Sequence, residues 1–425
     1  MNILKKIKNI LVKKIKLILK TNNHTPIIIP RSEHNISRKN INKNVLRILY
    51  TLKHNGYKSY LVGGGVRDLL LGRQPKDFDV VTNAYPDKIK KLFKHCYIIG
   101  RRFQLVHVHY GKDVVEVVTF RANHNHAKNH SKEGMILRDN SYGTIEEDAL
   151  RRDFTVNALY YNIDNYTLVD YAGGLKDLYA KQLCLIGDPI TRYREDPVRM
   201  LRAIRFSAKL QFSINNHTAE PIYLLKNLLF NIAPARLYDE YVKLFFYGHS
   251  LASFELLKKY ELLEILFPHW QNIKLHNIKQ SDVNFITSAL KNLDHKIANH
   301  KKINPAWGIA ILLWRELCVS ASKNHKITEQ QLSKFLIYKQ SAEKLLMEQN
   351  KIISLSKKLM LVIKDIWLMQ IKLAKVAGKA VKSVEKIRAS NKFEVAFEFL
   401  LLRQSCGDKR AQKIAAWWNK YLKNT

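Results

Sequence analysis

Cysteine is scarce in this sequence. Its 425 residues include only four cysteines, which lie far apart at Cys96, Cys184, Cys318 and Cys406. No two of them form a C-x-x-C pair, which argues against a zinc ribbon and against a disulfide scaffold. Widely spaced cysteines of this kind are typical of a reducing compartment, so we expect a cytoplasmic protein.

Acidic residues are also scarce. Asp and Glu together number 36 against 72 Lys and Arg, which gives a formal net charge of +36. An excess of this size is too large for an ordinary solvated surface and predicts a polyanionic partner, either a nucleic acid or an anionic membrane. Interleaved Arg, Tyr and Phe favour a nucleic acid, because these side chains pair with phosphates and stack on bases.

Unbroken apolar runs are missing from the N-terminal segment. Residues 1–20 place apolar side chains on one helical face and most of their lysines on the other. Because lysines interrupt the run throughout, the segment is neither a signal peptide nor a membrane span. Three interpretations stay open, in our order of preference: attachment to a membrane surface such as the inner membrane, an RNA-binding arm, and a helix packed on the body.

Glycine is infrequent, with 16 in the chain, yet three are consecutive at Gly63, Gly64 and Gly65. The apolar residues before them predict a strand, and the V-R-D-L-L-L-G after them predicts a short helix that ends at Gly72. Such a turn lets the backbone approach a ligand, and the first helical N–H groups favour an anion such as a triphosphate. The turn lacks both the GK[ST] of a P-loop and the spacing of a dinucleotide fingerprint.

Carboxylates follow this turn closely. The segment from Asp77 through Phe78 and Asp79 to Val81 alternates polar and apolar residues, so as a strand it places both carboxylates on one face, where they can bind Mg²⁺. Glu116 lies among valines in a later strand candidate, and we expect it to be buried. A buried carboxylate needs a metal or a cation, so Glu116 is a candidate third ligand, with a buried salt bridge as the alternative.

Two further segments combine arginines with carboxylates. In the segment 146–157, Arg152 can neutralise a phosphate, Asp153 can hydrogen-bond a ribose hydroxyl or support the metal carboxylates, and Asn157 can fix the turn. The alternative is a surface helix held by ion pairs. In the segment 194–206, Asp196 and Arg199 lie three residues apart and can form a planar donor and acceptor edge for a base. The alternative there is an ion-paired amphipathic helix.

These motifs carry a resemblance to a known family. G-G-x-V-R-D-x-L-L-G-x-x-P-x-D-x-D resembles the head-domain signature of the class II nucleotidyltransferases, the tRNA CCA-adding enzymes and bacterial poly(A) polymerases, and R-R-D-x-x-x-N and E-D-x-x-R also match. The resemblance covers about residues 30–270 and implies polymerisation without a template, by two-metal nucleotidyl transfer with two Mg²⁺ ions. It implies catalytic roles for Asp77, Asp79 and Asp153, metal binding by Asp77, Asp79 and Glu116, and nucleotide binding by Gly63, Gly64, Arg67, Arg152, Asp196, Arg199 and Arg202.

The branch within the family depends on smaller features. The segments IPRSEHNISRKNI, IIGRRFQLVHV and WWNKY, together with the third glycine of the turn, resemble the bacterial poly(A) polymerases. The resemblance implies a polynucleotide adenylyltransferase that adds AMP from ATP to RNA 3′ ends, in mRNA polyadenylation that promotes RNA decay, with RNA-decay proteins as partners. The alternatives are a tRNA CCA-adding enzyme and a non-catalytic RNA-binding adaptor, and the presence of every expected carboxylate counts against the adaptor.

The expected architecture is an α/β head, a small mixed sheet with helices on one side, followed by an all-α neck, body and tail. Strand candidates lie at 58–62, 77–82, 97–100, 104–110 and 114–119, and the pattern is almost wholly helical from about residue 186. We expect an N-terminal segment and linker (1–29), a head (30–185), a neck (186–270) and a basic RNA-binding body and tail (271–425). The polar stretch 123–134 reads as a loop rather than a zinc site built from His124, His126 and His130.

Overall fold

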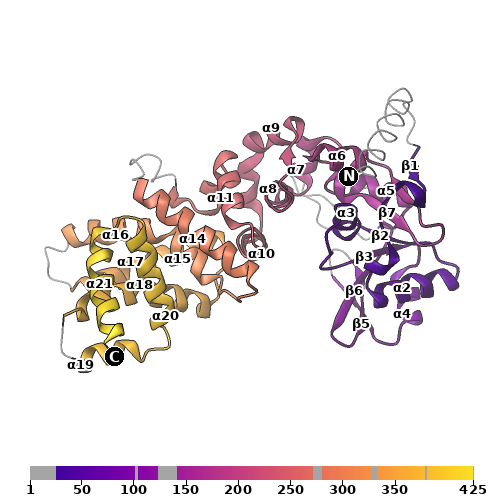
Figure 1. Ribbon diagram of the computed structural model, residues 1–425. Coiled ribbons are helices and arrows are strands. Elements are labelled where there is room, and N and C mark those ends of the chain that lie inside the picture. The colour runs from indigo at the N-terminus through magenta and orange to yellow at the C-terminus, as the bar shows by residue number, and fades with distance from the viewer. Residues whose placement is uncertain are drawn as a thin grey trace. The chain divides into compact units, whose positions relative to one another are not determined.

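The computed structural model describes residues 25–100, 104–122, 141–270, 280–327, 333–378 and 381–424. The chain divides into two compact units. The head unit comprises Met1–Arg199 and Gln211–Leu225, and the helical unit comprises Met200–Leu210 and Lys226–Thr425. The described part of the helical unit contains helices and no strand, so the expected α/β head and a mostly helical remainder are confirmed (Figure 1). The finer division into neck, body and tail stays a prediction.

Some expectations lie outside the described residues. These are the amphipathic helix of residues 1–20, residues 101–103 of the segment IIGRRFQLVHV, the polar stretch 123–134 with its histidines, and most of the boundary expected after Trp270. Within the described residues, no helix combines the length and the apolar character needed to cross a membrane. All four cysteines are free thiols, as their spacing predicts.

One eight-stranded sheet forms the centre of the head unit. Its strands, in spatial order, are β1 (Ile27–Ile29), β8 (Leu168–Asp170), β7 (Leu159–Asn162), β2 (Ser59–Val62), β3 (Asp79–Thr82), β6 (Asp113–Thr119), β5 (Leu105–Tyr110) and β4 (Cys96–Ile99). β3 and β6 are parallel, and the other neighbours are antiparallel, so the sheet is mixed as expected.

The five strand candidates correspond to β2 to β6, whereas β1, β7 and β8 were not predicted. Ile27–Ile29 was expected to be part of a linker, and this expectation was wrong, because the segment pairs with β8 along the sheet edge. A three-residue apolar strand is too short to show a period of two. Its pairing partner also lies far away in sequence, so local pattern could not identify it.

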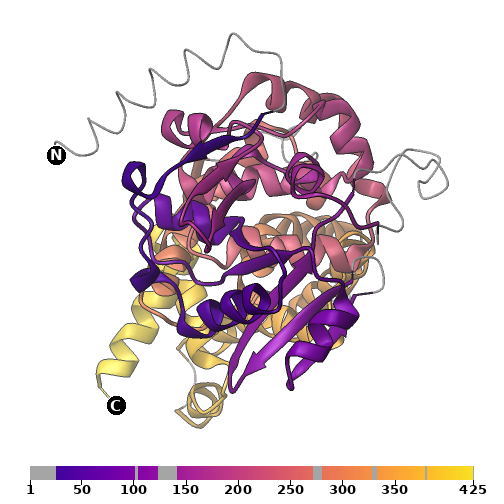
Figure 2. The same cartoon turned by 90° about the vertical axis from the view of Figure 1, so that its right-hand side faces the viewer.

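Helices cover both faces of the sheet. The hydroxyl of Ser59 donates to the carbonyl of Leu49 at 3.2 Å, which places α2 (Lys43–His54) on the face that holds the buried Val80 and Val117. α4 (Pro86–Leu92) packs on β4 and β5 (Figures 1 and 2). The expectation of helices on one side was wrong, because Ala149 of α5 (Ile145–Arg151) packs into a cluster on the opposite face.

The remaining helices of the head unit are short. They are α3 (Gly64–Leu70), α6 (Gly174–Ala180), α7 (Pro189–Glu195) and α9 (Asn216–Leu225), with 3-10 turns at Arg31–Glu33, Arg38–Asn40 and Thr155–Asn157. A small parallel pair joins β9 (Gln182–Leu183), at the end of the expected head, to β10 (Ser213–Ile214). β10 lies in the part of the chain that was expected to be wholly helical, so that expectation was wrong at this point.

The helical unit packs its helices around a core of aliphatic side chains with several buried aromatic rings. After a 3-10 turn at Lys226–Asn231 it contains α10 (Pro234–Phe245), α11 (Ser250–Lys259), α12 (Leu263–Leu266), α14 (Gln280–Ala298), α15 (Ala306–Leu312), α16 (Trp314–Ile327), α17 (Lys334–Ile352), α18 (Lys357–Val376), α19 (Val381–Arg388), α20 (Phe393–Ser405) and α21 (Lys409–Lys423). α8 (Val198–Leu210) also belongs here, apart from its first two residues. All six tryptophans lie in this unit, and the indoles of Trp367 and Trp418 are fully buried.

Candidate active site

The two expected carboxylates stand at the start of β3. Asp79 is the first residue of the strand and is partly exposed, and Asp77 precedes the strand and is exposed. In the register of the sheet, Asp79 lies beside Val62 of β2 on one side and Glu116 of β6 on the other. Residues in register on neighbouring strands share a face, so Asp79 and Glu116 point to the same side of the sheet.

Glu116 was expected to be buried, and this expectation was wrong. Its side chain is 50% exposed, and its carboxylate lies 3.5 Å from Nε2 of His107 on β5. The valine run hides the alternation of the strand, since Val115 and Val117 are buried on the opposite face. The argument from burial was therefore wrong, and the register with Asp79 is what supports Glu116 as a ligand. Among the described residues, no group of three or more His, Cys, Asp or Glu side chains is arranged to hold a metal ion.

The glycine turn meets Asp79 directly. Gly63 has φ +75° and ψ −142°, a backbone conformation that essentially only glycine adopts. A Cβ atom at this position would lie 3.1 Å from Oδ2 of Asp79 and 3.7 Å from Nη1 of Arg152. A Cβ at Gly65 would lie 3.0 Å from the Phe78 ring. The turn, a carboxylate and a guanidinium thus meet at one point of the fold.

Arg67 lies beneath the turn. Its side chain is 1% exposed and donates to Asp68 Oδ1 from Nε at 2.9 Å and from Nη2 at 2.7 Å, while Nη1 donates to Asn157 Oδ1 at 2.5 Å. A Cβ at Gly64 would lie 3.3 Å from Arg67 Nη2, so the guanidinium supports the turn from below. A direct contact of Arg67 with a triphosphate stays a prediction.

Arg152 is held in place by two buried partners. Its Nη2 lies 3.0 Å from Oδ2 of Asp148, and its Nε donates to the hydroxyl of Tyr160 at 2.9 Å. The same hydroxyl donates to Asp148 at 2.7 Å and closes the network. Burial alone would lower the pKa of Arg152, but Tyr160 and Asp148 outweigh it and raise the pKa. Arg152 is therefore a fixed cation beside Asp79.

Asp153 and Asn157 form the end of the same motif. Asp153 Oδ1 accepts a hydrogen bond from the N–H of the next residue, Phe154, at 2.8 Å. It also accepts one from Nδ2 of Asn157 at 3.3 Å. Because Asn157 also accepts from Arg67, it joins the arginine–aspartate motif to the glycine turn. These two hydrogen bonds, to Asp153 and from Arg67, are contacts of the type expected of a residue that fixes the turn.

An arginine cluster lies next to this motif, and the sequence analysis missed most of it. Arg192 of α7 donates from Nη2 to the carbonyl oxygens of Arg151 and Arg152, the latter at 2.6 Å. Burial, reinforced by neighbouring arginines, lowers the pKa of Arg151 to about 9 and that of Arg192 to about 10, and burial also lowers the pKa of Arg121. An anion bound among such crowded cations would reduce their mutual repulsion, so the cluster is a candidate anion-binding site.

Two of the three base-recognition candidates, Asp196 and Arg199, belong to the same unit as this cluster. Asp196 caps the C-terminus of α7, and its carbonyl accepts from the N–H of Arg199 at 3.0 Å. The ion pair that the structure gives Arg199 is with Glu195, at 2.8 Å, and the same Nη1 donates to the carbonyl of Arg192 at 2.7 Å. Arg202 falls in the helical unit, where its guanidinium lies 5.4 Å from the centre of the Phe206 ring.

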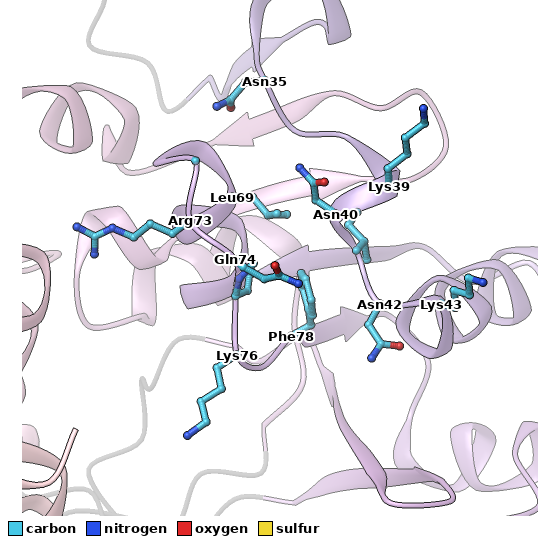
Figure 3. Close-up of a pocket in the computed structure, with 13 residues that line it drawn as sticks. Asn35, Lys39, Asn40, Asn42, Lys43, Leu69, Arg73, Gln74, Lys76 and Phe78 are labelled. Carbon is cyan, nitrogen blue, oxygen red and sulfur yellow. The ribbon is translucent and has the colours of Figure 1, made fainter. Parts of the chain in front are cut away.

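A separate open pocket lies at the start of α2. Its volume is about 810 Å³, and its lining includes Lys76 and Phe78 but neither Asp77 nor Asp79. Asn40, Gln74 and Phe78 lie near its centre, whereas the lysine and arginine side chains point outward in different directions (Figure 3). The cations do not converge there, in contrast to the arginine cluster.

Known proteins place this geometry in a family. Three family models match the chain: Poly A polymerase head domain over residues 59–184, Probable RNA and SrmB-binding site of polymerase A over 211–274, and Polymerase A arginine-rich C-terminus over 330–425. Poly(A) polymerase I of Salmonella typhimurium is 43% identical over 401 residues, which cover 93% of this chain and 85% of that protein.

The CCA-adding enzymes are similar over a shorter stretch. The enzyme of Lactobacillus helveticus is 36% identical over 217 residues, 51% of this chain and 53% of its own length. The solved structure of the Thermotoga maritima CCA-adding enzyme complexed with tRNA is 19% identical and matches with a TM-score of 0.62 over 93% of this chain and 85% of that one, which shows a shared fold. Because the long match extends through head and helical unit alike, the chain belongs to the poly(A) polymerase family of nucleotidyltransferases.

Proposed function

We propose that this protein is a template-independent polynucleotide adenylyltransferase, which adds AMP residues from ATP to RNA 3′ ends in polyadenylation that promotes RNA decay. The observation that carries the proposal is the meeting of Gly63, Asp79 and Arg152 at one point. A backbone turn without a side chain, a carboxylate and a fixed cation are what a nucleoside triphosphate and its reacting phosphate require. The long match to a poly(A) polymerase I supports the choice of ATP and RNA.

The donor set fits a divalent metal. Asp77 and Asp79 offer carboxylate oxygens, the ligands that Mg²⁺ prefers, and both side chains reach solvent. Glu116 shares the face of Asp79 and would become the third carboxylate only if a bound metal draws these side chains together, because the described residues do not hold three such ligands in place. Two bound Mg²⁺ ions would supply an activated 3′-hydroxyl and charge balance for the departing pyrophosphate.

The remaining roles fall to arginines and their supports. Arg151, Arg152 and Arg192 bind the triphosphate, because an anion relieves the repulsion that lowers the pKa of Arg151 and Arg192. Arg67 keeps the glycine turn rigid, and Asp153 orients the sugar or the metal carboxylates. Asp196 and Arg199 present the edge that selects the base, with Arg202 contributing positive charge.

Partners and location belong to the same proposal. A family description that names RNA and SrmB binding matches residues 211–274, which supports contacts with RNA. Contacts with RNA-decay proteins stay a prediction. The net charge of +36 supports a grip on arbitrary RNA 3′ ends. A cytoplasmic location, with residues 1–20 attached to the inner membrane surface, stays a prediction.

The decisive experiment uses the purified full-length chain, 5′-labelled RNA, Mg²⁺ and each nucleoside triphosphate in a separate reaction. A long ladder on a gel with ATP alone is the expected result. Addition of two C and one A to a tRNA lacking its end would identify a CCA-adding enzyme instead, and RNA binding without extension would identify an adaptor. Asp79→Asn should lower the rate by at least about two to three orders of magnitude without loss of RNA binding, whereas the exposed Asp87→Asn should not.

A further inference from the structure

One half of the sheet face that carries Asp79 is covered by other residues, and the other half is exposed to solvent. Toward β2 and β7 it is packed under Ala149, together with Val62 and Val81. Toward β6, β5 and β4 it reaches solvent, whereas the opposite face of the same strands is buried. Asp79 and Glu116 stand at the boundary between the two parts.

A single in-register row crosses the open part. Asp79 on β3 is level with Glu116 on β6, Glu116 with His107 on β5, and His107 with Tyr97 on the edge strand β4. Since neighbouring strands lie about 4.8 Å apart, the row extends about 14 Å from the carboxylate to the tyrosine.

Aromatic side chains occupy the far end of this row. Tyr97 is 63% exposed, so its ring faces solvent on the edge strand. Its ring centre lies 5.3 Å from that of His109, at an interplanar angle of 87°, and His109 lies 6.3 Å from His107. Val114, in register with His109, is also exposed. The open face therefore presents contiguous rings and apolar surface that begin at the candidate metal carboxylates.

Single-stranded RNA fits such a face better than another protein does. Bases stack on exposed rings, while phenol and imidazole groups can also hydrogen-bond to phosphates and base edges. Sheet faces with aromatic residues on adjacent strands bind roughly two or three bases in known RNA-binding domains. A 3′-hydroxyl at Asp79 must be followed by the preceding nucleotides, and this face is the sheet surface that continues outward from Asp79.

We propose that the surface formed by Tyr97, His107, His109 and Val114 holds the last two or three bases of the RNA that is being extended. The proposal rests on the proposed function, because it places the 3′-hydroxyl at Asp79. It assigns β4 and β5 a role in binding the RNA strand and none in binding ATP.

Photo-crosslinking tests the surface directly. The full-length protein is irradiated with single-stranded RNA that carries 5-iodouridine at one of the last three positions, without nucleoside triphosphate, and the crosslinked peptides are identified by mass spectrometry. Crosslinks to Tyr97, His107 or His109 are expected. Crosslinks that occur only in other segments would overturn the proposal.

Kinetics of variants provide the second arm. Tyr97→Ala should raise the KM for RNA roughly 5- to 150-fold, the loss of one stacked base, with an unchanged KM for ATP, and Tyr97→Phe should restore the wild-type value. Tyr179→Ala, a change at another exposed tyrosine of the head unit, is the matched control and should have no effect. An unchanged KM for RNA in Tyr97→Ala would contradict the proposal.

The outcomes separate the two hypotheses. Failure of the wild-type protein to extend any RNA would count against the proposed function, while crosslinking would still decide where RNA lies. Sedimentation velocity tests the remaining alternative, that a second copy of this chain binds the surface. If Tyr97→Ala dissociates an oligomer and leaves RNA affinity intact, the surface is an interface between copies of this chain, and the RNA proposal is wrong.

Discussion

Arg192 donates from Nη2 to the main-chain carbonyl of Arg152 at 2.6 Å, and so ties α7 to the arginine–aspartate motif. The helix that leads into the base-recognition candidates is thereby fixed to the segment that places a cation beside Asp79. Lysine cannot reproduce the planar fork of a guanidinium. We expect Arg192→Lys to lower kcat/KM for ATP by about 10- to 100-fold, the scale of charge-assisted hydrogen bonds. Steady-state kinetics check this, and Arg194→Lys on the exposed side of the same helix should change little.

Gly63 offers a test with a closely matched control. Alanine at Gly63 would adopt φ +75° and place its Cβ 3.1 Å from Asp79, whereas alanine at Gly56 would adopt φ +81° with no atom within 4 Å. Both substitutions should lower the free energy of unfolding by about 1–2 kcal/mol, because both strain the backbone. Only Gly63→Ala should abolish ATP-dependent extension. Equal activities of the two variants, with denaturation curves as the stability measure, would refute the role of the turn.

The arginine cluster predicts a trade between stability and function. Arg151→Gln removes one of the mutually repelling, partly buried cations, whose repulsion together with burial lowers the pKa of Arg151. We expect the melting temperature without nucleotide to rise by a few degrees, roughly 1 kcal/mol, and the KM for ATP to rise as well. Arg47→Gln, at an exposed arginine of α2, is the control. A lower melting temperature together with an unchanged KM would mean that Arg151 is a structural residue only.

Base selection can be separated from charge at Arg199. Its guanidinium is held by Glu195 at 2.8 Å and by the carbonyl of Arg192 at 2.7 Å. Arg199→Ala should reduce the preference for ATP over UTP and GTP by roughly 1–3 kcal/mol, the scale of one good contact to a base. Competition between nucleotides in single-step extension measures this. If the preference is unchanged and only RNA affinity falls, the base reader lies elsewhere.

His34 predicts a dependence of stability on pH. Its Nδ1 accepts from the N–H of Ile36, and its Nε2 donates to the carbonyl of Tyr166 at 2.8 Å, so the ring is neutral in the fold. Burial lowers its pKa below the ordinary 6.5. Between the two pKa values the unfolded chain binds more protons than the folded chain, so the free energy of unfolding should decrease as the pH falls below about 6.5.

Calorimetry between pH 7.5 and 5 measures this effect. His34→Gln should remove part of the acid sensitivity, on the order of 1 kcal/mol, whereas His54→Gln at an exposed position should keep it. A wild-type slope in His34→Gln would show that another group is responsible.

Local pattern predicted most of the central strands, because β5 alternates between buried and partly exposed residues and the glycine turn limits β2. β3 is buried along its length after Asp79, so only its polar start gave a signal. It misled at Glu116, because β6 carries valines on both faces and the period of two is lost. The pairing of Arg67 with Asn157, ninety residues apart, depends on tertiary packing and leaves no local signal.

The same limit applies to the arginine cluster. Arg151 is the first residue of the R-R-D-x-x-x-N motif, to which the sequence analysis gave roles only at Arg152, Asp153 and Asn157. Arg192 is an ordinary basic residue of a short helix until α7 is packed against that motif. The lowered pKa values arise from that packing. Sequence could therefore identify the motifs and their chemistry, whereas the convergence of the cations required the fold.

The placement of the tryptophans makes intrinsic fluorescence a specific probe of the helical unit. All six lie in the helical unit, and two of them are fully buried, with their indole N–H groups donating to the carbonyls of Ala310 and Leu373. Intrinsic emission excited at the red edge of indole absorption therefore reports on that unit alone and is silent about the head. A denaturation curve followed by emission, set against one followed by loss of ATP-dependent extension, would reveal whether the two units melt together or one after the other.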